Sequence, residues 1–293
     1  MPAILDGKKI AAEIRAEIAD GVRRLRGEKD VTPGIAFVTV GEDPASRAYV
    51  TMKEKGCAEV GIRSRQCSFP ASAGADQILG KIQALNADPA VHGILVQLPL
   101  PAGIDARVIL SSVSPEKDVD GFHPLNVGRM ALGIAGFRPC TPAGVIELLL
   151  RSGGAWGGMD VVVVGRSDIV GKPLAAMLMQ RGSRLNATVT VCHTGTRDLA
   201  AHTRRADIVV AAIGRPRFLK GAMVREGVTV IDVGINRVED RSSPKGYRIV
   251  GDVDFDEVAQ KAAAISPVPG GVGPMTIAML LSNTLEAARR GAR

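Results

Sequence analysis

The chain opens with apolar residues at helical spacing and continues with short apolar runs separated by turns. One helical stripe consists of Ile10, Ile14, Ile18, Val22 and Leu25. Asp6 stands where it can cap that helix. Strand-like and helical segments then alternate over residues 35–40, 44–60, 62–69, 75–86 and 91–97. This α-β-α-β-α-β order predicts a largely parallel α/β sheet with right-handed crossovers.

A second alternating region follows a helix that opens at Thr141-Pro142. Strands are expected over residues 159–165, 188–192, 207–213, 228–233 and 248–250, and a helix over 172–181. This alternation indicates a Rossmann-type, doubly wound parallel sheet. We expect residues 1–140 to form one domain and 141–274 a second, with a final helix in 275–293 packing back on the first. The segment 238–247 is expected to be a surface loop.

Composition narrows the class of protein. Hydrophobic residues make up 46% of the 293 positions but aromatic residues only 3%, so aliphatic side chains must fill the core. This bias suits buried parallel strands. The sequence has no apolar run long enough to span a membrane and no apolar secretion signal at its start, so we expect a cytoplasmic protein without a membrane partner. The four cysteines are scattered without a C-x-x-C pair, and we expect no metal.

The net charge of +7 is compatible with two kinds of ligand. Nucleic acid is one, but the basic residues are dispersed, and two tyrosines and one tryptophan offer no stacking platform. An anionic small molecule, such as a phosphorylated cofactor or a polyglutamate, fits the charge as well. We expect no nucleic-acid partner, although the charge alone does not decide between the two.

The segment Val161–Pro173 (VVVVGRSDIVGKP) has the order strand, glycine turn and helix start. Gly165 permits a tight turn, Gly171 lets helix and strand approach, and the helix N-terminus offers N–H groups to a phosphate. The segment departs from G-x-G-x-x-G because Ser167 and Val170 take the second and third glycine positions. A plain turn between strand and helix therefore remains an alternative.

The residues after the next strand favour NADP over NAD. An NAD site usually has Asp or Glu at that strand end, whereas here the strand ends Val191-Cys192-His193-Thr194. Arg166 can pair with a ribose 2′-phosphate. The hydroxyls of Ser167 and Thr194 can add hydrogen bonds. His193 either assists or is a structural histidine.

Tyr49 and Lys53 lie four residues apart on one face of a predicted helix. A tyrosine ring can stack on a flat heterocycle, and a lysine facing a cleft can serve as a base or proton relay. The alternative is a lysine that reaches solvent beside a half-buried tyrosine. Short-chain dehydrogenases also use Tyr-x-x-x-Lys, but after the nucleotide turn, whereas this pair precedes it.

Three further segments are candidates for a site. Gln97 follows a buried strand, where ligand sites form in parallel sheets, and its amide both donates and accepts. The loop 117–124 contributes Asp118 and Asp120, which a surface loop or a divalent cation would also explain. The loop 267–276 combines prolines and glycines, so that a planar ligand can lie against its main chain. A rigid domain connection is the alternative for this last loop.

Taken together, these segments resemble the bifunctional methylenetetrahydrofolate dehydrogenase/cyclohydrolases. The resemblance runs in order from about Ile4 to the final helix. Its motifs are residues 40–46 (VGEDPAS), 49–53, 96–101 (VQLPLP), 117–126, 139–142 (PCTP), 165–173, 230–237 (VIDVGINR), 251–253 (GDV) and 267–276 (PVPGGVGPMT). A single motif would be ambiguous, but this ordered set is specific.

The resemblance implies a catalytic, folate-binding N-terminal domain, an NADP-binding Rossmann domain, a cleft between them, and a homodimer. It makes Lys53 the central catalytic residue, held by Gln97, with Tyr49 stacking on the folate and Asp120 holding the pterin. Ser46, Pro269, Gly270 and Gly273 are the further residues expected to bind folate. The residues expected to hold NADP are Gly165, Arg166, Ser167, Thr194 and Ile235. Thr194 replaces the serine typical of the family but keeps the hydroxyl.

The implied reaction has two steps. A hydride leaves the methylene carbon of 5,10-methylenetetrahydrofolate for the nicotinamide, which requires positioning more than a base. Water then attacks the methenyl cation, a proton is removed, and the ring opens to 10-formyltetrahydrofolate, a step that suits a nearby lysine. The alternatives are a dehydrogenase without cyclohydrolase activity and a nucleotide-sensing or nucleic-acid-binding protein that only shares the fold.

Overall fold

The computed structural model describes residues 1–181, 184–243 and 246–292. Its contacts divide the chain into two compact units. Unit 1 consists of residues 1–11 and 141–276, and unit 2 of residues 12–140 and 277–293. The chain therefore passes between the units three times: within α1 (Gly7–Lys29), at the start of α6 (Cys140–Arg151) and within α10 (Val272–Gly291). Within the described ranges, no helix is both long and apolar enough to cross a membrane.

Unit 2 is built on a three-stranded parallel sheet of order β3-β2-β4. Its elements, besides most of α1 and α10, are β2 (Gly34–Val40), α2 (Pro44–Val60), β3 (Arg63–Phe69), α3 (Ala75–Ala87), β4 (Gly93–Val96), α4 (Ala106–Ser111) and α5 (Pro124–Ala131). Every residue of β2 is buried, as expected for a central strand covered on both faces.

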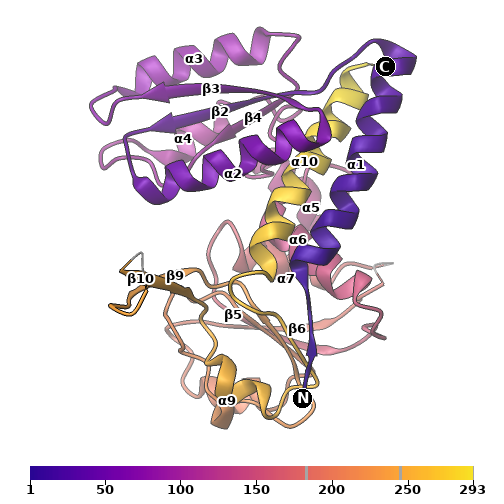
Figure 1. The fold of residues 1–293 in the computed structure, drawn as a ribbon, viewed down its shortest axis with the longest axis vertical. Coiled ribbons are helices and arrows are strands. Elements are labelled where there is room, and N and C mark those ends of the chain that lie inside the picture. The colour runs from indigo at the N-terminus through magenta and orange to yellow at the C-terminus, as the bar shows by residue number, and fades with distance from the viewer. Residues whose placement is uncertain (182–183, 244–245, 293) are drawn as a thin grey trace. The chain divides into compact units, whose positions relative to one another are not determined.

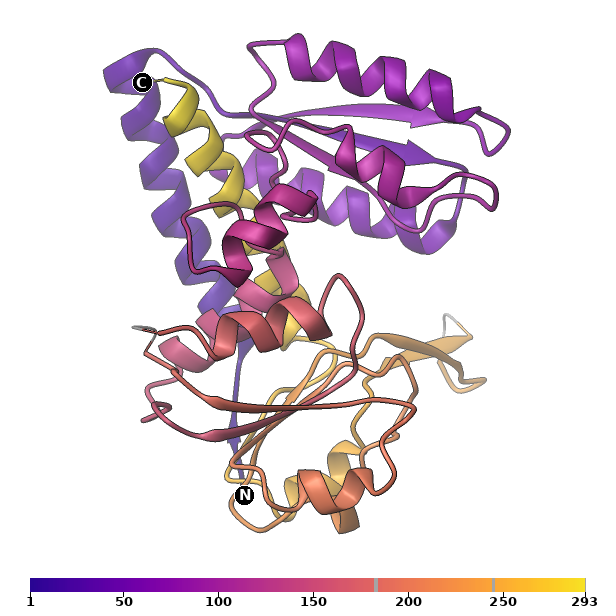
Figure 2. The same cartoon turned by 180° about the vertical axis from the view of Figure 1, so that it is seen from behind.

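Helices cover both faces of the sheet in unit 2. One face presents Ala36, Val38 and Val96 to the buried side chains of α3 and α4. Figures 1 and 2 show α2 on the opposite face from α3 and α4. The predicted helical stripe of α1, from Ile10 to Leu25, is buried at every position. In both views α1 runs beside α10, and the two are so close that a Cβ on Gly21 would lie 2.6 Å from Cδ2 of Leu285.

Unit 1 is built on a six-stranded sheet of order β1-β11-β8-β7-β5-β6, parallel throughout. Its strands are β1 (Ala3–Ile4), β5 (Asp160–Val164), β6 (Thr188–Cys192), β7 (Ile208–Ala211), β8 (Thr229–Asp232) and β11 (Ala264–Ile265). An antiparallel hairpin joins β9 (Asn236–Glu239) to β10 (Tyr247–Val250). The short helices are α7 (Gly171–Leu178), α8 (Leu199–Thr203), η1 (Gly221–Met223) and α9 (Phe255–Ala259).

The sheet of unit 1 is wound on both faces. Val162, Val209 and Val230 pack with Leu199 of α8 and Val258 of α9 on one face. Figures 1 and 2 show α7 on the other face. The chain reverses direction across the sheet at β5, which has β6 on one side and β7 on the other. Ligands bind at such a switch point in open α/β sheets, outside the carboxyl ends of the strands. The predicted fold class is confirmed.

Two sequence-based expectations need correction. The segment 238–247 is not a plain loop, because its two ends belong to β9 and β10. Charged residues such as Arg237 and Glu239 leave β9 without an apolar run, so the pattern did not reveal it, whereas β10 is the strand predicted over 248–250 with one more residue at its start. Pro244 and Lys245, which fall within the predicted segment, lie outside the described residues. The helix predicted over 172–181 is α7, which ends earlier, at Leu178.

Candidate active site

Helix α2 presents Tyr49 and Lys53 on one face, one turn apart. The helix begins where the sequence predicted, because the Asp43 side chain accepts a hydrogen bond from Ser46 N at 2.7 Å. It ends at Gly61, whose φ of 81° is left-handed. Caps at both ends fix the length and rotation of α2, and these determine where Lys53 points.

Lys53 and Gln97 are in direct contact. Lys53 Nζ donates a hydrogen bond to Gln97 Oε1 at 2.9 Å. The other end of the Gln97 amide is held as well, since Nε2 donates to the Leu98 carbonyl at 2.8 Å. The Gln97 main chain continues the sheet, with its N–H donating to Val38 O at 2.8 Å. Gln97 therefore offers Lys53 an acceptor in a fixed orientation.

Asp120 lies within electrostatic range of Lys53. Burial raises the pKa of the Asp120 carboxyl, while the positive charge of Lys53 and a hydrogen bond from the Cys140 thiol lower it. Burial and the Asp120 charge raise the pKa of Cys140 well above its usual value, so this cysteine stays a neutral thiol that can donate to the carboxylate. The group Lys53, Gln97, Asp120 and Cys140 thus combines a cation, an amide, a carboxylate and a thiol.

The loop that carries Asp120 is held from both sides by buried groups. Asp118 is 4% exposed and accepts hydrogen bonds from His123 N at 2.9 Å and from Asn126 Nδ2 at 2.8 Å. Desolvation raises the pKa of Asp118 to about 6 despite these donors. Asn283 Nδ2 donates to Val119 O at 2.8 Å. Of the two carboxylates in this loop, Asp118 is therefore structural, and Asp120 is the one near Lys53.

The two remaining predicted residues of unit 2 are less constrained. Tyr49 is half-buried, and desolvation raises the pKa of its phenol, so the ring is neutral and suited to stacking. Ser46 is also half-buried, and its main-chain N–H is already used in the cap of α2. Among the described residues, no group of three or more His, Cys, Asp and Glu side chains could hold a metal ion.

The predicted nucleotide turn of unit 1 is built on close main-chain contacts. Gly165 has a φ of 129°, and a Cβ on it would lie 2.0 Å from Ala212 O. A Cβ on Gly171 would lie 2.2 Å from Gly165 O. Ser167 Oγ accepts from Gly171 N at 3.3 Å, and Arg166 is exposed. The turn thus has the compact main chain that a phosphate site needs, with a cation at its surface.

The turn after β6 is fixed by its own side chains. His193 Nδ1 accepts from Gly195 N at 3.0 Å, and Thr196 Oγ1 accepts from His193 N at 2.9 Å. His193 therefore has a structural role in this turn. Thr194 is exposed at its surface, where its hydroxyl can meet a ligand.

The Pro-Gly loop of unit 1 is anchored to the start of α1. Gly270 O accepts from Lys8 N at 3.0 Å, and Gly271 N donates to Pro267 O at 2.8 Å. Ile235 is 46% exposed, and its Cδ1 would lie 3.8 Å from a Cβ on Gly273. The loop therefore lies next to Ile235, a residue predicted to hold the cofactor.

Two buried carboxylates in unit 1 were not singled out from the sequence. Asp232 ends β8 and Asp252 follows β10, and they are 4% and 0% exposed. Desolvation raises the pKa of Asp232 to about 6, and the negative charge of Asp252 adds to the effect. The motifs VIDVGINR and GDV contain these residues. The sequence does not show, however, that the Asp232 carboxylate accepts a hydrogen bond from the main chain of Asp252, 20 positions away.

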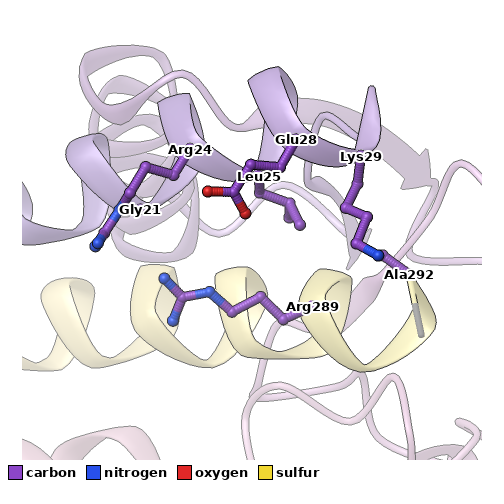
Figure 3. Close-up of a pocket in the computed structure, with 7 residues that line it drawn as sticks. All are labelled: Gly21, Arg24, Leu25, Glu28, Lys29, Arg289 and Ala292. Carbon is purple, nitrogen blue, oxygen red and sulfur yellow. The ribbon is translucent and has the colours of Figure 1, made fainter.

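A separate surface hollow of about 350 Å³ lies in unit 2, between the C-terminal parts of α1 and α10 (Figure 3). It is lined by Gly21, Arg24, Leu25, Glu28, Lys29, Arg289 and Ala292. Basic residues at helix C-termini favourably complement the helix dipoles, which accounts for Lys29 and Arg289 here. None of the residues predicted to act in the site lines this hollow.

A Rossmann-type sheet in one unit and a Lys–Gln–Asp group in the other define a two-domain nucleotide-dependent enzyme. A model of the tetrahydrofolate dehydrogenase/cyclohydrolase catalytic domain matches residues 5–120, and a model of the NAD(P)-binding domain of the same family matches residues 139–292. The chain belongs to the tetrahydrofolate dehydrogenase/cyclohydrolase family. The predicted family and both predicted activities are thereby confirmed.

Individual relatives match over the full length. Bifunctional protein FolD from Geotalea uraniireducens is 56% identical over 290 residues, which are 99% of this chain and 100% of that protein. A solved bifunctional FolD from Campylobacter jejuni superposes with a TM-score of 0.93 at 47% identity, covering 99% of both chains. FolD from Trypanosoma brucei, solved in complex with NADP and an inhibitor, has a TM-score of 0.94 at 41% identity and covers 100% of this chain and 99% of its own.

Proposed function

We propose that this chain oxidises 5,10-methylenetetrahydrofolate with NADP and hydrolyses the methenyl product to 10-formyltetrahydrofolate, with Lys53 as the residue that handles the proton in the second step. The observation that carries the proposal is the 2.9 Å hydrogen bond from Lys53 Nζ to the fixed amide of Gln97. A monofunctional dehydrogenase has no need of a lysine held in this way. The family membership supports both steps.

The proposed roles follow from the chemistry of each group. When bound, NADP supplies the hydride acceptor. Hydrolysis then requires that a water molecule lose a proton as its oxygen bonds to the methenyl carbon, and Lys53 is the proposed relay for that proton. Gln97 holds the Lys53 side chain in place. Asp120 accepts hydrogen bonds from the pterin and fixes the orientation of the ring, and Tyr49 stacks on it.

The substrate and cofactor are assigned to further residues on the same basis. Ser46, Pro269, Gly270 and Gly273 are proposed to contact the folate. The NADP site is assigned to Gly165, Arg166, Ser167, Thr194 and Ile235. Gly165 and Gly171 suit a cofactor site because the turn is packed so closely there that a side chain would collide with the main chain. Arg166 is an exposed cation that can pair with the 2′-phosphate. Unit 2 is the proposed folate domain and unit 1 the proposed NADP domain, so that residues 1–11, which were expected from the sequence in the first domain, belong to the second.

The experiment is one assay with two cofactors. The purified protein is mixed with 5,10-methylenetetrahydrofolate and either NADP or NAD, while reduced cofactor, methenyl intermediate and formyl product are followed together. We expect turnover with NADP that ends in 10-formyltetrahydrofolate. If the methenyl compound accumulates and decays no faster than without enzyme, the chain is a dehydrogenase only. If neither cofactor is reduced, the proposal is wrong.

We further propose that the working form is a cytoplasmic homodimer that accepts folates with or without a polyglutamate tail. The surplus of positive charge supports an anionic substrate tail. Sedimentation of the purified chain tests the dimer, since a monomeric mass at assay concentrations would contradict it. Comparison of KM for mono- and pentaglutamylated substrate tests the tail.

A further inference from the structure

The two buried carboxylates of unit 1 have no part in the reaction described so far. Asp252 is fully buried, and its carboxylate accepts hydrogen bonds from three N–H groups in two different segments of the chain. Oδ2 accepts from Ile213 N at 2.5 Å and from Gly214 N at 2.8 Å, in the turn after β7. Oδ1 accepts from Asn236 Nδ2 at 2.8 Å, at the start of β9. Asp252 therefore ties the turn after β7 to the start of β9.

Asp232 holds the segment that carries Asp252. Its Oδ1 accepts from Gly234 N and from Asp252 N, each at 2.9 Å, and its Oδ2 accepts from Val253 N at 2.9 Å. The packing leaves no room for side chains, because a Cβ on Gly251 would lie 1.8 Å from Asp232 Oδ2. Likewise, a Cβ on Gly234 would lie 2.3 Å from Asp252 Oδ1. The two carboxylates and two glycines form one tightly packed main-chain junction.

This junction lies at the carboxyl ends of β7 and β8, the end of such a sheet at which a dinucleotide binds. The turn after β7 begins at Ala212, whose carbonyl approaches Gly165 of the nucleotide turn. A dinucleotide lies across the switch point of such a sheet, with one half on each side. The side of β6 carries the hydroxyl of Thr194, assigned to the 2′-phosphate end. The side of β7 and β8, which the junction controls, therefore receives the nicotinamide half.

We propose that Asp252, supported by Asp232, is a positioning residue for hydride transfer. It fixes the turn at Ile213–Gly214 and, through Asn236, the neighbouring Ile235, so that the nicotinamide is held at the correct distance from the methylene carbon. The proposal rests on the proposed function and extends it to residues that touch neither cofactor nor substrate. Binding of the adenosine half and the hydrolysis step do not depend on this junction.

The test uses an exchange of donor and acceptor. Asp252→Asn keeps the shape of the side chain but replaces one acceptor oxygen with an NH₂ group. Because Oδ2 serves two main-chain N–H groups, the new NH₂ group will face Asn236 Nδ2, so that two donors oppose each other. Asn236→Asp in the same chain restores the pair with the donor on the other side. Asp256→Asn, an exposed acid four residues further along, is the matched control for charge.

Three measurements are made on each variant: dehydrogenase kcat and KM, hydrolysis of added methenyltetrahydrofolate, and binding of 2′,5′-ADP, which has the adenosine end but no nicotinamide. In Asp252→Asn we expect dehydrogenase kcat to fall about tenfold or more, since small misplacements of reacting groups are costly. Hydrolysis and 2′,5′-ADP binding should stay within about twofold of wild type, because neither uses the junction. The double variant should regain most of the lost kcat, and Asp256→Asn should match wild type.

Two outcomes overturn the proposal: unchanged dehydrogenase kcat in Asp252→Asn, or a lost kcat accompanied by equal loss of 2′,5′-ADP binding, which would mean that unit 1 is generally damaged. If Asp252→Asn does not fold, Asn236→Leu removes the same hydrogen bond without changing the carboxylate, and full kcat in that variant also overturns it. Failure of the proposed function is distinguishable, because wild type itself would then lack dehydrogenase activity.

Discussion

At the scale of single residues, the contact between Lys53 and Gln97 sets the clearest expectation. Lys53→Met keeps the length of the side chain but removes the group assigned to proton transfer. We expect hydrolysis of methenyltetrahydrofolate to fall by about 10²- to 10⁴-fold, the usual contribution of a positioned acid or base. The decay of methenyl absorbance measures it. Lys55→Met, an exposed lysine on the same helix, should hydrolyse normally, and equal loss in both variants would remove Lys53 from its role.

Arg166 is expected to decide between the two cofactors. In Arg166→Gln, a cation that can pair with the 2′-phosphate is lost, while the main chain of the turn is kept. Because a hydrogen bond to a charged group contributes about 1.5–3 kcal/mol, KM for NADP should rise by about 10- to 100-fold. KM for NAD, which has no 2′-phosphate, is the internal control and should change little. A parallel rise for both cofactors would show that Arg166 shapes the turn rather than reading the phosphate.

Some residues of the site could be predicted from the sequence and others could not. Lys53, Gln97 and Asp120 were identified because each stands in a short motif, and the structure brings Gln97 and Asp120 to Lys53. Their binding and catalytic roles remain predictions. Asp232 and Asp252 were not predicted because their carboxylates accept hydrogen bonds mainly from main-chain N–H groups. Since nearly every residue has such a group, the sequence does not mark the donors. Burial of an acid without a nearby cation is visible only in three dimensions.

At the scale of elements, replacing either of two helix glycines in unit 2 by alanine should change the free energy of unfolding, and in opposite directions. Gly61 ends α2 with a φ of 81°, a conformation that a side chain disfavours. Gly61→Ala should therefore lower the free energy of unfolding by about 1 kcal/mol. Gly27 lies inside α1 with nothing within 4 Å of a built Cβ, so Gly27→Ala should raise it by about 0.4–1 kcal/mol. Urea titrations of both variants measure the difference, and equal changes of the same sign would contradict it.

Helix α2, which has signals at both ends, was predicted well, whereas the short helices α4, α8 and α9 were not predicted although an aspartate caps each of them, and neither were the shortest strands. The bounds of α2 match the prediction because Asp43 and Gly61 mark both ends in the sequence. In contrast, β1 and β11 are two residues each, and they pair across almost the whole chain. No local pattern can show a pairing of that kind. Strand β9 was not predicted for a different reason, since its charged residues interrupt any apolar run, whereas its partner β10 was expected over 248–250.

At the scale of the whole molecule, the buried acid Asp232 makes the stability of unit 1 depend on pH. Its pKa is raised from 3.8 to about 6 in the fold. The folded state therefore keeps a proton that the unfolded chain has released, and the stability that this proton adds is complete below pH 4 and lost as pH rises through 6. The shift corresponds to a loss of up to about 3 kcal/mol.

Trp156 is the only tryptophan and belongs to unit 1, so its fluorescence reports unfolding there. Urea titrations between pH 4 and pH 7 should show a smaller pH dependence in Asp232→Asn than in wild type. Exposed Asp256→Asn is the control and should keep the wild-type dependence. Identical curves for wild type and Asp232→Asn would show that this carboxyl does not titrate in the window.

The three passages of the chain between the units have a consequence for how the protein is made. Neither unit is one continuous stretch, because unit 1 takes its edge strand β1 from the first residues and pairs it with β11 near residue 264. Unit 2 in turn needs the end of α10. On the ribosome, therefore, neither unit can complete its fold until nearly the whole chain has emerged. A gene cut at a single point cannot separate the two units, because any continuous fragment that contains the whole of one unit also contains a large part of the other.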